Sequence, residues 1–387
     1  MYGSDAIAGV INFIMKKNYE GHEVSAMTGD DSAKGDFGRY NFTYTGGFAT
    51  DNSNTTVVLD YFKRDELMNE DRPIDVTFLS STRVTIDGRD YAEPWCGTAT
   101  SNGGTRCQYD YVNERAIQPD TKNLGATLNH IYRLGDEKEL FVEAMYQKNT
   151  GHSYDSAGSF DLRLPGNAAA VPQWVRTIDA QNGSVGTIRV RSRFPERRMQ
   201  EYDSNSYRLL AGIRGETNIF GSSETWRYET AATLGKSDNE VLHVSGYYNL
   251  DRLSAAIGNG QYNPFNLGRD TPSDVIAGLR ELAPRVGESD VKSWDFNISG
   301  NIAELPAGPV SAVFGGEWRS EDIFDTPALV AQQGLVSTLG ASDAAADRTQ
   351  YAGYAEFNLP ITEKFDVISA LRYDHYSDFG GDANPKV

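Results

Sequence analysis

Apolar and polar residues alternate along several segments of the chain. In residues 37–46, Tyr40, Phe42 and Tyr44 share one face and polar residues share the other. The same alternation recurs at 203–215, 224–236, 290–303 and 310–320. A period of two with one apolar face is typical of half-buried β-strands. Less regular patterns predict further strands near 21–28, 54–64, 122–133, 139–150, 347–359 and 365–376, and a twelfth that begins around Pro385.

The connections between the predicted strands alternate in length. Short ones lie at 47–54, 135–138, 220–223, 304–308 and 360–364, and long ones at 65–121, 151–202, 237–289 and 321–346. Tight turns at one end and long loops at the other are typical of an outer-membrane barrel. Compact soluble domains rarely hold several structureless loops of this length. The pattern therefore predicts an all-β fold, an antiparallel up-and-down transmembrane β-barrel.

Aromatic residues of the apolar face gather at both ends of the predicted strands. Those beside short turns are Tyr44, Trp226, Tyr228 and Phe357, and those beside long loops are Tyr61, Tyr146, Tyr207, Trp294, Trp318, Tyr351 and Tyr373. A transmembrane barrel carries two such girdles, one at each membrane interface. The rim of a β-sandwich is the alternative explanation. The polar face would line the interior, with Asn41, Thr43, Glu143, Arg208, Arg214, Arg227, Glu229, Asp295, Asn297, Glu317 and Arg319.

Composition leaves the membrane assignment open and argues against nucleic acid. The mean hydropathy is -0.50, and no window approaches the roughly eighteen apolar residues that a membrane helix needs. Alternating strands average to polar, so a low hydropathy does not exclude a transmembrane barrel. The net charge is -18 and no basic stripe is apparent, which disfavours nucleic acid as a partner.

The two cysteines, Cys96 and Cys107, lie in the loop-like stretch PWCGTATSNGGTRCQY. No other Cys or His is close enough in sequence to suggest a zinc site, so a short disulfide loop is predicted. Such a loop implies an oxidising compartment and stabilises the fold by about 3 kcal/mol in the chain-entropy model. The acidic stretch 29–36 lacks the spacing of a calcium loop, and no metal site or cofactor is predicted.

The N-terminal run YGSDAIAGVINFIMKK resembles the end of the plug domain in TonB-dependent outer-membrane receptors. The matching residues are Tyr2, Gly3, Ser4, Asp5, Ala6, Ile7, Ala8, Gly9, Val10, Ile11 and Asn12. Weaker resemblances to barrel strands of the family follow at 314–321, 351–361 and 371–386. The resemblance implies that residues 1–18 end a plug domain and that residues 19–387 form the N-terminal half of a receptor barrel.

About eleven or twelve strands are predicted, whereas receptors of this family have about 22 strands. An open half-barrel would leave two rows of backbone groups unpaired in lipid, and each unpaired group costs several kcal/mol. We therefore expect the chain to be a fragment of a longer reading frame, with Met1 internal or a mispredicted start.

The resemblance also implies a function. The complete receptor would bind a scarce ligand, most commonly a ferric siderophore, with its extracellular loops and plug. The TonB energy-transducing complex would then move the plug, without a cofactor and without enzymatic chemistry. Loop aromatics often act as recognition anchors, although ordinary loop packing is the alternative for each. The candidates for ligand contact are Trp95, Tyr109, Tyr111, Trp174, Tyr262 and Phe265, and NPFN (263–266) resembles a loop motif of some family members.

Other functions remain open at this stage. A passive porin would have no plug, and the run Tyr2–Asn12 argues against that possibility. An outer-membrane or secreted β-rich hydrolase is a second alternative, although neither HExxH nor GxSxG occurs. A secreted carbohydrate-binding module is a third, and it would be soluble without detergent. The sequence does not identify the ligand.

Overall fold

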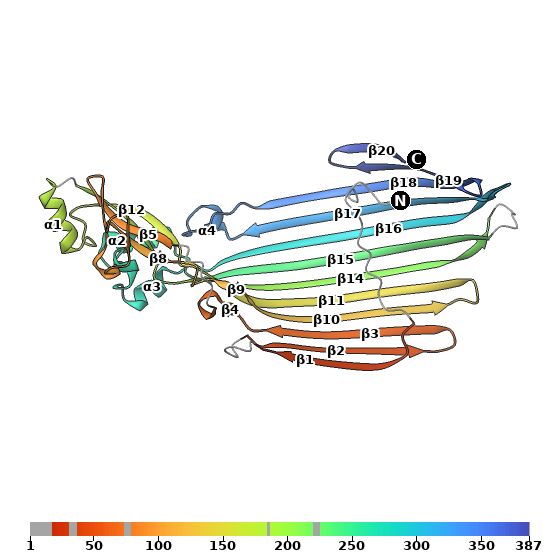
Figure 1. The fold of residues 1–387 in the computed structure, drawn as a ribbon, viewed down its shortest axis with the longest axis horizontal. Coiled ribbons are helices and arrows are strands. Elements are labelled where there is room, and N and C mark those ends of the chain that lie inside the picture. The colour runs from red at the N-terminus through yellow and green to blue at the C-terminus, as the bar shows by residue number, and fades with distance from the viewer. Residues whose placement is uncertain (1–17, 31–36, 73–78, 184–185, 220–224, 387) are drawn as a thin grey trace.

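The computed structural model describes residues 18–30, 37–72, 79–183, 186–219 and 225–386. Twelve strands in this part of the chain form one antiparallel sheet in which spatial neighbours follow one another in sequence (Figure 1). They are β1 (Gly21–Gly29), β2 (Arg39–Ala49), β3 (Ser53–Arg64), β10 (Asp120–Arg133), β11 (Lys138–Asp155), β14 (Arg198–Asn218), β15 (Thr225–Ser245), β16 (Ala283–Leu305), β17 (Gly308–Pro327), β18 (Ala344–Thr362), β19 (Phe365–Tyr376) and β20 (Gly380–Lys386). This order confirms the predicted up-and-down fold. The sheet is open, with β1 and β20 at its edges.

Each predicted strand is present, and most extend further toward the long loops than the alternation indicated. β16 has 23 residues, which corresponds to about 75 Å of extended chain and exceeds the thickness of a membrane core. The twelfth strand begins at Gly380 and not around Pro385. Gly380 and Gly381 have no side chains that could show an alternation, and only pairing with β19 defines them as strand. The plug-like residues Tyr2–Asn12 lie outside the described residues.

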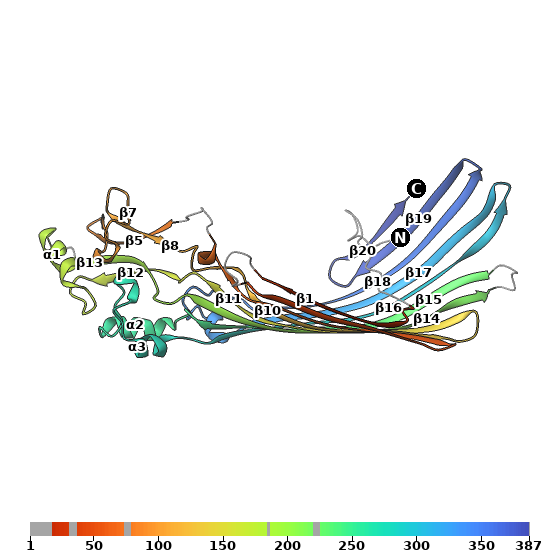
Figure 2. The same ribbon diagram turned by 60° about the horizontal axis from the view of Figure 1, so that its bottom comes forward.

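The large sheet is curved into a trough (Figure 2), and strand alternation gives its two faces different side chains. Aromatic side chains project from its convex face. Trp294, Trp318, Tyr351 and His375 occupy directly paired positions on four successive strands, β16 to β19. Trp294, Trp318 and Tyr351 remain 48%, 41% and 49% exposed, as expected for side chains that face lipid. They belong to the predicted aromatic row beside the long loops, which we name the loop-side girdle.

The second aromatic row, the turn-side girdle, lies near the short turns. Trp226 stacks on Phe314 with ring centroids 6.4 Å apart, and Phe314 meets the edge of the Phe357 ring at 5.7 Å. Trp226 and Phe314 come from β15 and β17, so they bridge the intervening strand β16. Gly300 of β16 lies beneath the Trp226 ring, where a side chain would block this contact.

Three of the long connections fold together beyond one end of the large sheet (Figure 1). They form a second sheet in the order β12-β13-β5-β8-β7, with β6 beside β5, and a separate β4–β9 pair. The bounds are β4 (Leu67–Met68), β5 (Leu79–Ile86), β6 (Arg89–Tyr91), β7 (Thr100–Ser101), β8 (Arg106–Asp110), β9 (Ala116–Gln118), β12 (Ser159–Pro165), β13 (Thr187–Arg193), α1 (Gln173–Gln181), α2 (Leu250–Gly258) and α3 (Ser273–Leu279). We name this unit the loop assembly. A fourth connection holds α4 (Leu329–Gln332).

The loop assembly has its own hydrophobic core. One face of the small sheet supplies Val84, Ile86, Ile188 and Val190, all with no exposed surface. Residues from the three helices cover this face, among them Val175 of α1, Leu253 and Ile257 of α2, and Ile276 of α3. The sequence predicted long loops here, and the structure shows a folded unit instead. In the described residues, no helix is long and apolar enough to span a membrane.

The packing of Trp226 over Gly300 generates a stability prediction. A Cβ at Gly300 would lie 2.5 Å from Trp226 Cδ2, whereas a Cβ at Gly353 on the same face would meet nothing within 4 Å. We expect Gly300→Ala to destabilise the protein by about 1–3 kcal/mol, the usual effect of overpacking, and Gly353→Ala to have no such effect. Urea unfolding in detergent micelles, followed by tryptophan fluorescence, measures both variants. Equal midpoints for the two variants would contradict the packing described here.

Candidate functional site

The concave face of the large sheet is lined by paired charges. Strand alternation places the predicted polar set on this face, opposite the girdles. Arg208 pairs with Glu143 across β14 and β11 at 3.3 Å. Arg214 lies between Glu139 of β11 and Glu229 of β15, bonded to the first and 3.6 Å from the second. Complementary charges therefore run across several strands.

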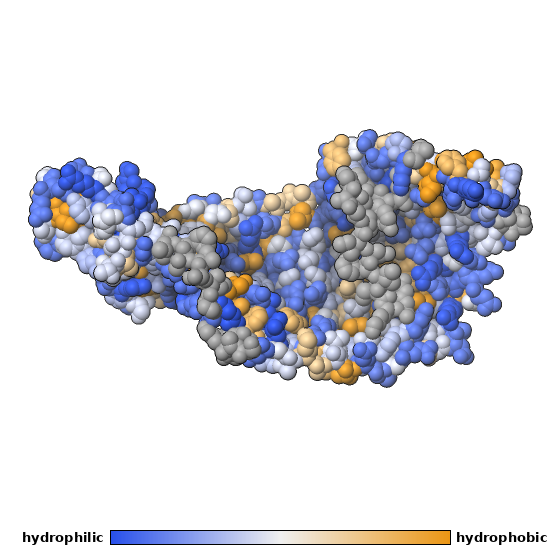
Figure 3. Space-filling view, viewed as in Figure 1, coloured by the Kyte–Doolittle hydropathy of each residue, from blue (hydrophilic) through white to orange (hydrophobic). Residues whose placement is uncertain are grey.

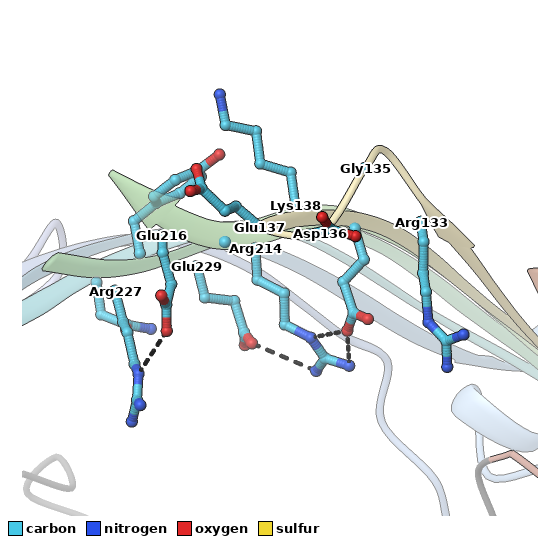
Figure 4. A pocket seen from close by; sticks show the side chains of 13 residues that line it. Arg133, Gly135, Asp136, Glu137, Lys138, Arg214, Glu216, Arg227 and Glu229 are labelled. Carbon is cyan, nitrogen blue, oxygen red and sulfur yellow. Dashed lines mark hydrogen bonds and ion pairs between the residues drawn. The ribbon is translucent and has the colours of Figure 1, made fainter. Parts of the chain in front are cut away.

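Arg214, Glu139 and Glu229 border a pocket of about 480 Å³ near the short turns (Figure 4). Arg214, Glu229 and Arg227 project from the sheet in the same direction in this view, and Arg227 pairs with Glu216 at 3.2 Å. Because its side chains are charged, this wall stays hydrated. It can contact another polar surface without burying apolar area that would hold the two surfaces together. It suits a partner that must separate from it.

A buried charged cluster on the concave face was not expected from the sequence. Arg372 and Asp374 of β19 are each 2% exposed. The Arg372 guanidinium donates from Nε to Asp374 at 2.9 Å and from Nη2 to Glu317 of β17 at 2.6 Å. Residues i and i+2 of a strand share a face, so the Arg-x-Asp spacing was the available signal.

The loop assembly presents a second charged surface on the face of its small sheet that the helices leave open. The arginines of this face include Arg83, Arg106, Arg163, Arg189 and Arg191. Only Asp90 and Asp161 accompany them as ion-pair partners in the described residues. We name this surface the arginine face. In Figure 2, α2 and α3 lie beneath the small sheet, so the arginine face is turned toward the side on which the large sheet is concave.

Each aspartate of the arginine face holds two arginines. Arg189 donates to both oxygens of Asp161 at 2.7 and 2.6 Å, and Arg191 donates to the same carboxylate at 2.5 Å. The Arg189 hydrogen bonds, assisted by Arg191, lower the pKa of Asp161 to about 2. Asp161 is therefore ionised at neutral pH and fixes two guanidinium groups in place.

A pocket of about 420 Å³ opens beside these arginines, between β5, β12 and β13. Arg83, Arg191 and Arg193 line it together with several Ser and Thr hydroxyls and with Asp161, whose charge Arg189 and Arg191 neutralise. Fixed guanidinium groups and hydroxyl donors at a concave site are suited to an anionic, oxygen-rich ligand. The sequence expectation that no basic stripe exists is wrong at this place. The alternation of Arg189, Arg191 and Arg193 in TIRVRSR was the overlooked signal.

The predicted loop aromatics fall into two groups. Trp95, Tyr109, Tyr111 and Trp174 are half-buried in the loop assembly. The Arg193 guanidinium lies over the rings of Tyr109 and Tyr111, 5.0 and 5.1 Å from their centroids. Arg269 similarly covers Trp95 at 5.8 Å. These aromatics thus position arginines in the structure, and their contact with a ligand stays a proposal.

Tyr262 and Phe265 differ from the expected exposed anchors. They are 0% and 3% exposed and belong to the hydrophobic core of the loop assembly, with Trp174 against the Phe265 ring at 6.5 Å. The NPFN segment forms a tight turn in which Asn266 has a positive φ of 52°. Its position is set by core packing and by Glu93, whose carboxylate accepts from Asn266 N at 2.7 Å. Neither aromatic is available to a ligand.

One short-range cross-link and one long-range hydrogen bond help to hold the loop assembly together. Cys96 and Cys107 form a disulfide, with Cα atoms 5.5 Å apart. The nearby Glu93 is buried and reaches the NPFN turn across 173 positions of sequence. Among the described residues, no group of three or more His, Cys, Asp or Glu side chains is arranged to hold a metal ion.

Hydrogen bonds and ion pairs join the long connections to one another at the base of the loop assembly. Glu196 accepts from Tyr248 Oη at 2.9 Å and from Arg280 Nε at 2.9 Å. The adjacent Arg197 donates to both carboxylate oxygens of Glu70 at 3.0 and 3.1 Å. These bonds join three of the long connections where they leave the strands.

A curved antiparallel sheet with a lipid-type convex face and a polar concave face defines a wall of a transmembrane β-barrel. The family model described as TonB dependent receptor-like, beta-barrel, matches residues 181–387. This match covers more than half of the chain, and the chain belongs to that family. The family's members are outer-membrane receptors and transporters, which places the protein in the outer membrane of a Gram-negative bacterium.

Solved structures of the ferric enterobactin receptor PfeA of Pseudomonas aeruginosa have a similar fold. A mutant in complex with enterobactin is 15% identical, with a TM-score of 0.53, and the match covers 99% of this chain and 44% of that one. The complex of PfeA with BCV-L6 is 16% identical, with a TM-score of 0.54 and the same coverage. This chain thus spans less than half the length of these receptors. No curated protein matches it.

The Glu196 link generates a prediction about loop docking. Burial raises the pKa of Glu196, but hydrogen bonds from Arg280 and Tyr248 outweigh it and leave the pKa below its ordinary value of 4.5. The link therefore contributes fully above that value and is lost as the pH falls through the lowered pKa. We expect Glu196→Gln to speed hydrogen exchange in residues 246–282 about tenfold at pH 7, because a charged hydrogen-bond network is lost.

Hydrogen exchange read by mass spectrometry measures this effect in detergent micelles. Glu304→Gln, which removes an exposed carboxylate near a short turn, is the matched control and leaves the exchange of residues 246–282 unchanged. Native exchange rates in the Glu196 variant would show that the loops are held together without this link.

Proposed function

We propose that this chain forms part of an outer-membrane receptor that captures an anionic iron chelate, a ferric siderophore, with its loop assembly. Import would follow through TonB-driven movement of the plug. The family membership supports a receptor or transporter in general terms. The arginine face is the single observation that carries the choice of an anionic ligand.

The charge balance of the protein makes the arginine face unusual. The chain has a net charge of -18, so its surface as a whole repels anions. The arginine face concentrates positive charge beside a pocket of about 420 Å³. Hydrophilic residues also dominate the view onto the concave side, including the loop assembly, wherever Figure 3 leaves them uncovered. An anion that approaches this side would be attracted to one place.

The arginines are held in position before any ligand arrives. Asp161 and Asp90 each bridge two guanidinium groups, and every guanidinium has five N–H donors. Donors that the aspartates do not use remain available for ligand oxygens. Because the geometry is fixed in advance, little conformational entropy would be lost on binding.

The import step rests on other features. The run Tyr2–Asn12 resembles the end of a plug, and the paired charges of the concave wall suit a partner that separates during transport. PfeA, which shares the fold, is described as a ferric enterobactin receptor. For the present chain, TonB and the plug are proposed partners, and the particular siderophore is left open.

Ligand binding provides the direct test. We expect ferric enterobactin, used as an anionic probe, to quench the tryptophan fluorescence of the purified protein in detergent with a saturable isotherm. Arg189→Gln combined with Arg191→Gln should weaken this binding about a hundredfold, because two charge-assisted donor sets are removed.

Lys364→Gln is the matched control, since it removes one positive charge at a short turn far from the loop assembly. It should leave the isotherm unchanged. Equal affinity of the double variant and the native protein would overturn the assignment of the arginine face to the ligand. Quenching that never saturates would argue for a passive pore.

A further inference from the structure

The small sheet of the loop assembly has a gap between two of its strands. β5 pairs with β13 from Ile86 as far as Arg83, which lies opposite Arg191, and the pairing of these two strands ends there. Beyond this point β5 continues beside β8, on its other side, and β13 continues beside β12. The pocket of about 420 Å³ opens where the two strands part, between residues 80–83 and 191–193, and we name it the strand gap.

Two buried hydroxyl groups line the strand gap without a hydrogen-bond partner. Thr82 and Ser192 are 2% and 3% exposed, and neither hydroxyl oxygen has a partner among the described residues. Strand alternation places both on the face of Val84 and Val190, which the helices cover, whereas Arg83 lies on the arginine face. The strand gap therefore reaches through the sheet from one face to the other. A buried polar group without a partner is unfavourable, so these hydroxyls favour a ligand that brings oxygen atoms to this depth.

The mouth of the strand gap carries uncompensated positive charge. Two carboxylates, those of Asp90 and Asp161, each hold two arginines there, so two of the four positive charges are left over. Arg83 and Arg191, one from each set, are directly paired across β5 and β13, and like charges at such positions repel each other. Burial lowers the pKa of Arg83, and the neighbouring arginines add to this effect. An anion at the mouth would relieve the repulsion.

Arg193 supplies a further positive charge at the wall of the strand gap. Its Nε donates to Ser80 Oγ at 3.2 Å and its Nη1 donates to Ala157 O at 2.5 Å, and both acceptors are uncharged. The rings of Tyr109 and Tyr111 hold the same guanidinium in place. A ligand that neutralises the strand gap therefore needs at least two negative charges.

The lining of the strand gap suits aliphatic oxygen groups better than aromatic rings. Its hydroxyl side chains are Ser80, Ser81, Thr82, Ser159 and Ser192. The aromatic side chain in the lining is Phe160, whose ring packs against Phe194 in the hydrophobic core with centroids 4.9 Å apart. In a catecholate chelate the ring oxygens face the iron, so the outer edge of each ring is hydrocarbon. Such a ring in the strand gap would leave the hydroxyls of Thr82 and Ser192 buried and unpaired, which is unfavourable.

We propose that the strand gap selects an iron chelate built from aliphatic hydroxycarboxylates. Carboxylates of the chelate bind Arg83 and Arg191 at the mouth, and its deeper hydroxyl or carboxylate oxygens pair with Thr82 and Ser192. This inference rests on the proposed function, because it takes the arginine face as the place where the ligand arrives. The ligand class differs from that of PfeA, which is described as a ferric enterobactin receptor.

The chemistry of the two partners is complementary. Guanidinium groups bind carboxylates in a planar, two-pronged geometry, and a hydroxyl can both donate to and accept from an oxygen-rich ligand. A volume of about 420 Å³ lies toward the lower end of small-molecule sites and suits a compact chelate. Such a chelate also brings several negative charges to a place where positive charge is left over.

Isothermal titration calorimetry of the purified protein in detergent tests the proposal. The probes are ferric citrate, an aliphatic hydroxycarboxylate chelate, and ferric enterobactin, a catecholate chelate. We expect the native protein to bind ferric citrate at least about tenfold more tightly than ferric enterobactin. Thr82→Val combined with Ser192→Ala should weaken ferric citrate binding about thirtyfold, the effect of two lost hydrogen bonds. The same variant should leave the affinity for ferric enterobactin unchanged.

Thr100→Val combined with Ser101→Ala is the matched control, since these residues belong to β7 of the same sheet and do not line the strand gap. It should keep the native affinity for ferric citrate. Each single variant, Thr82→Val or Ser192→Ala, should lose part of that affinity. Without ligand, the double variant of the strand gap should unfold at the native temperature or above it, because it removes buried hydroxyls that lack partners. A clearly lower unfolding temperature would show that these hydroxyls are structural and would overturn the proposal.

The outcomes separate this proposal from the proposed function. If ferric enterobactin binds through Arg189 and Arg191 and ferric citrate binds no more tightly, the arginine face keeps its role and selection by the strand gap is overturned. An unchanged affinity for ferric citrate in the double variant would overturn it as well, since water alone would then occupy the strand gap. If neither chelate binds to the native protein, both proposals fall.

Discussion

Hydrogen bonding between neighbouring strands is the interaction on which the rest of the molecule depends. In a lipid environment an unpaired backbone group costs several kcal/mol, so each strand needs a partner along its whole buried length. In the described residues the register pairs each strand of the large sheet with its neighbours from β1 to β20, apart from a few bulges, and leaves one side of each edge strand open. Once the register is fixed, alternation decides which side chains face lipid and which face the interior. The girdles and the paired charges both follow from that single constraint.

The large sheet could be predicted from the sequence because its information is local. Trp294 and Trp318 mark the same level on two neighbouring strands, and the short turn between them fixes their pairing. A strand such as β20 escaped full prediction, since Gly380 and Gly381 show no alternation and are defined by pairing alone. The family assignment rests on a match to residues 181–387, outside the plug-like run that first suggested it.

The loop assembly could not be predicted in the same way. Its strands are short, and β5 pairs with β13 about a hundred positions later in the chain. No local sequence pattern therefore predicts the pairing of these two strands. Tyr262 and Phe265 looked like exposed loop aromatics because nothing near them in sequence supplies the core that buries them. The arginine face was missed for a related reason. The acidic total of the chain concealed a local excess of positive charge, of which Arg189, Arg191 and Arg193 were the local sign and to which the fold adds Arg83 and Arg106.

The tie between Glu93 and Asn266 has a consequence for biogenesis. A contact that spans 173 positions cannot form until the intervening strands have brought the two loops to the same rim. Closing so large a loop before the wall exists would be entropically unfavourable, whereas the disulfide between Cys96 and Cys107 closes a separation of only 11. The cross-link can therefore be made early, in the periplasm, while the surrounding unit consolidates last. A folded loop assembly detected at the cell surface would then indicate that insertion is complete, since a partly inserted chain has no folded loop assembly.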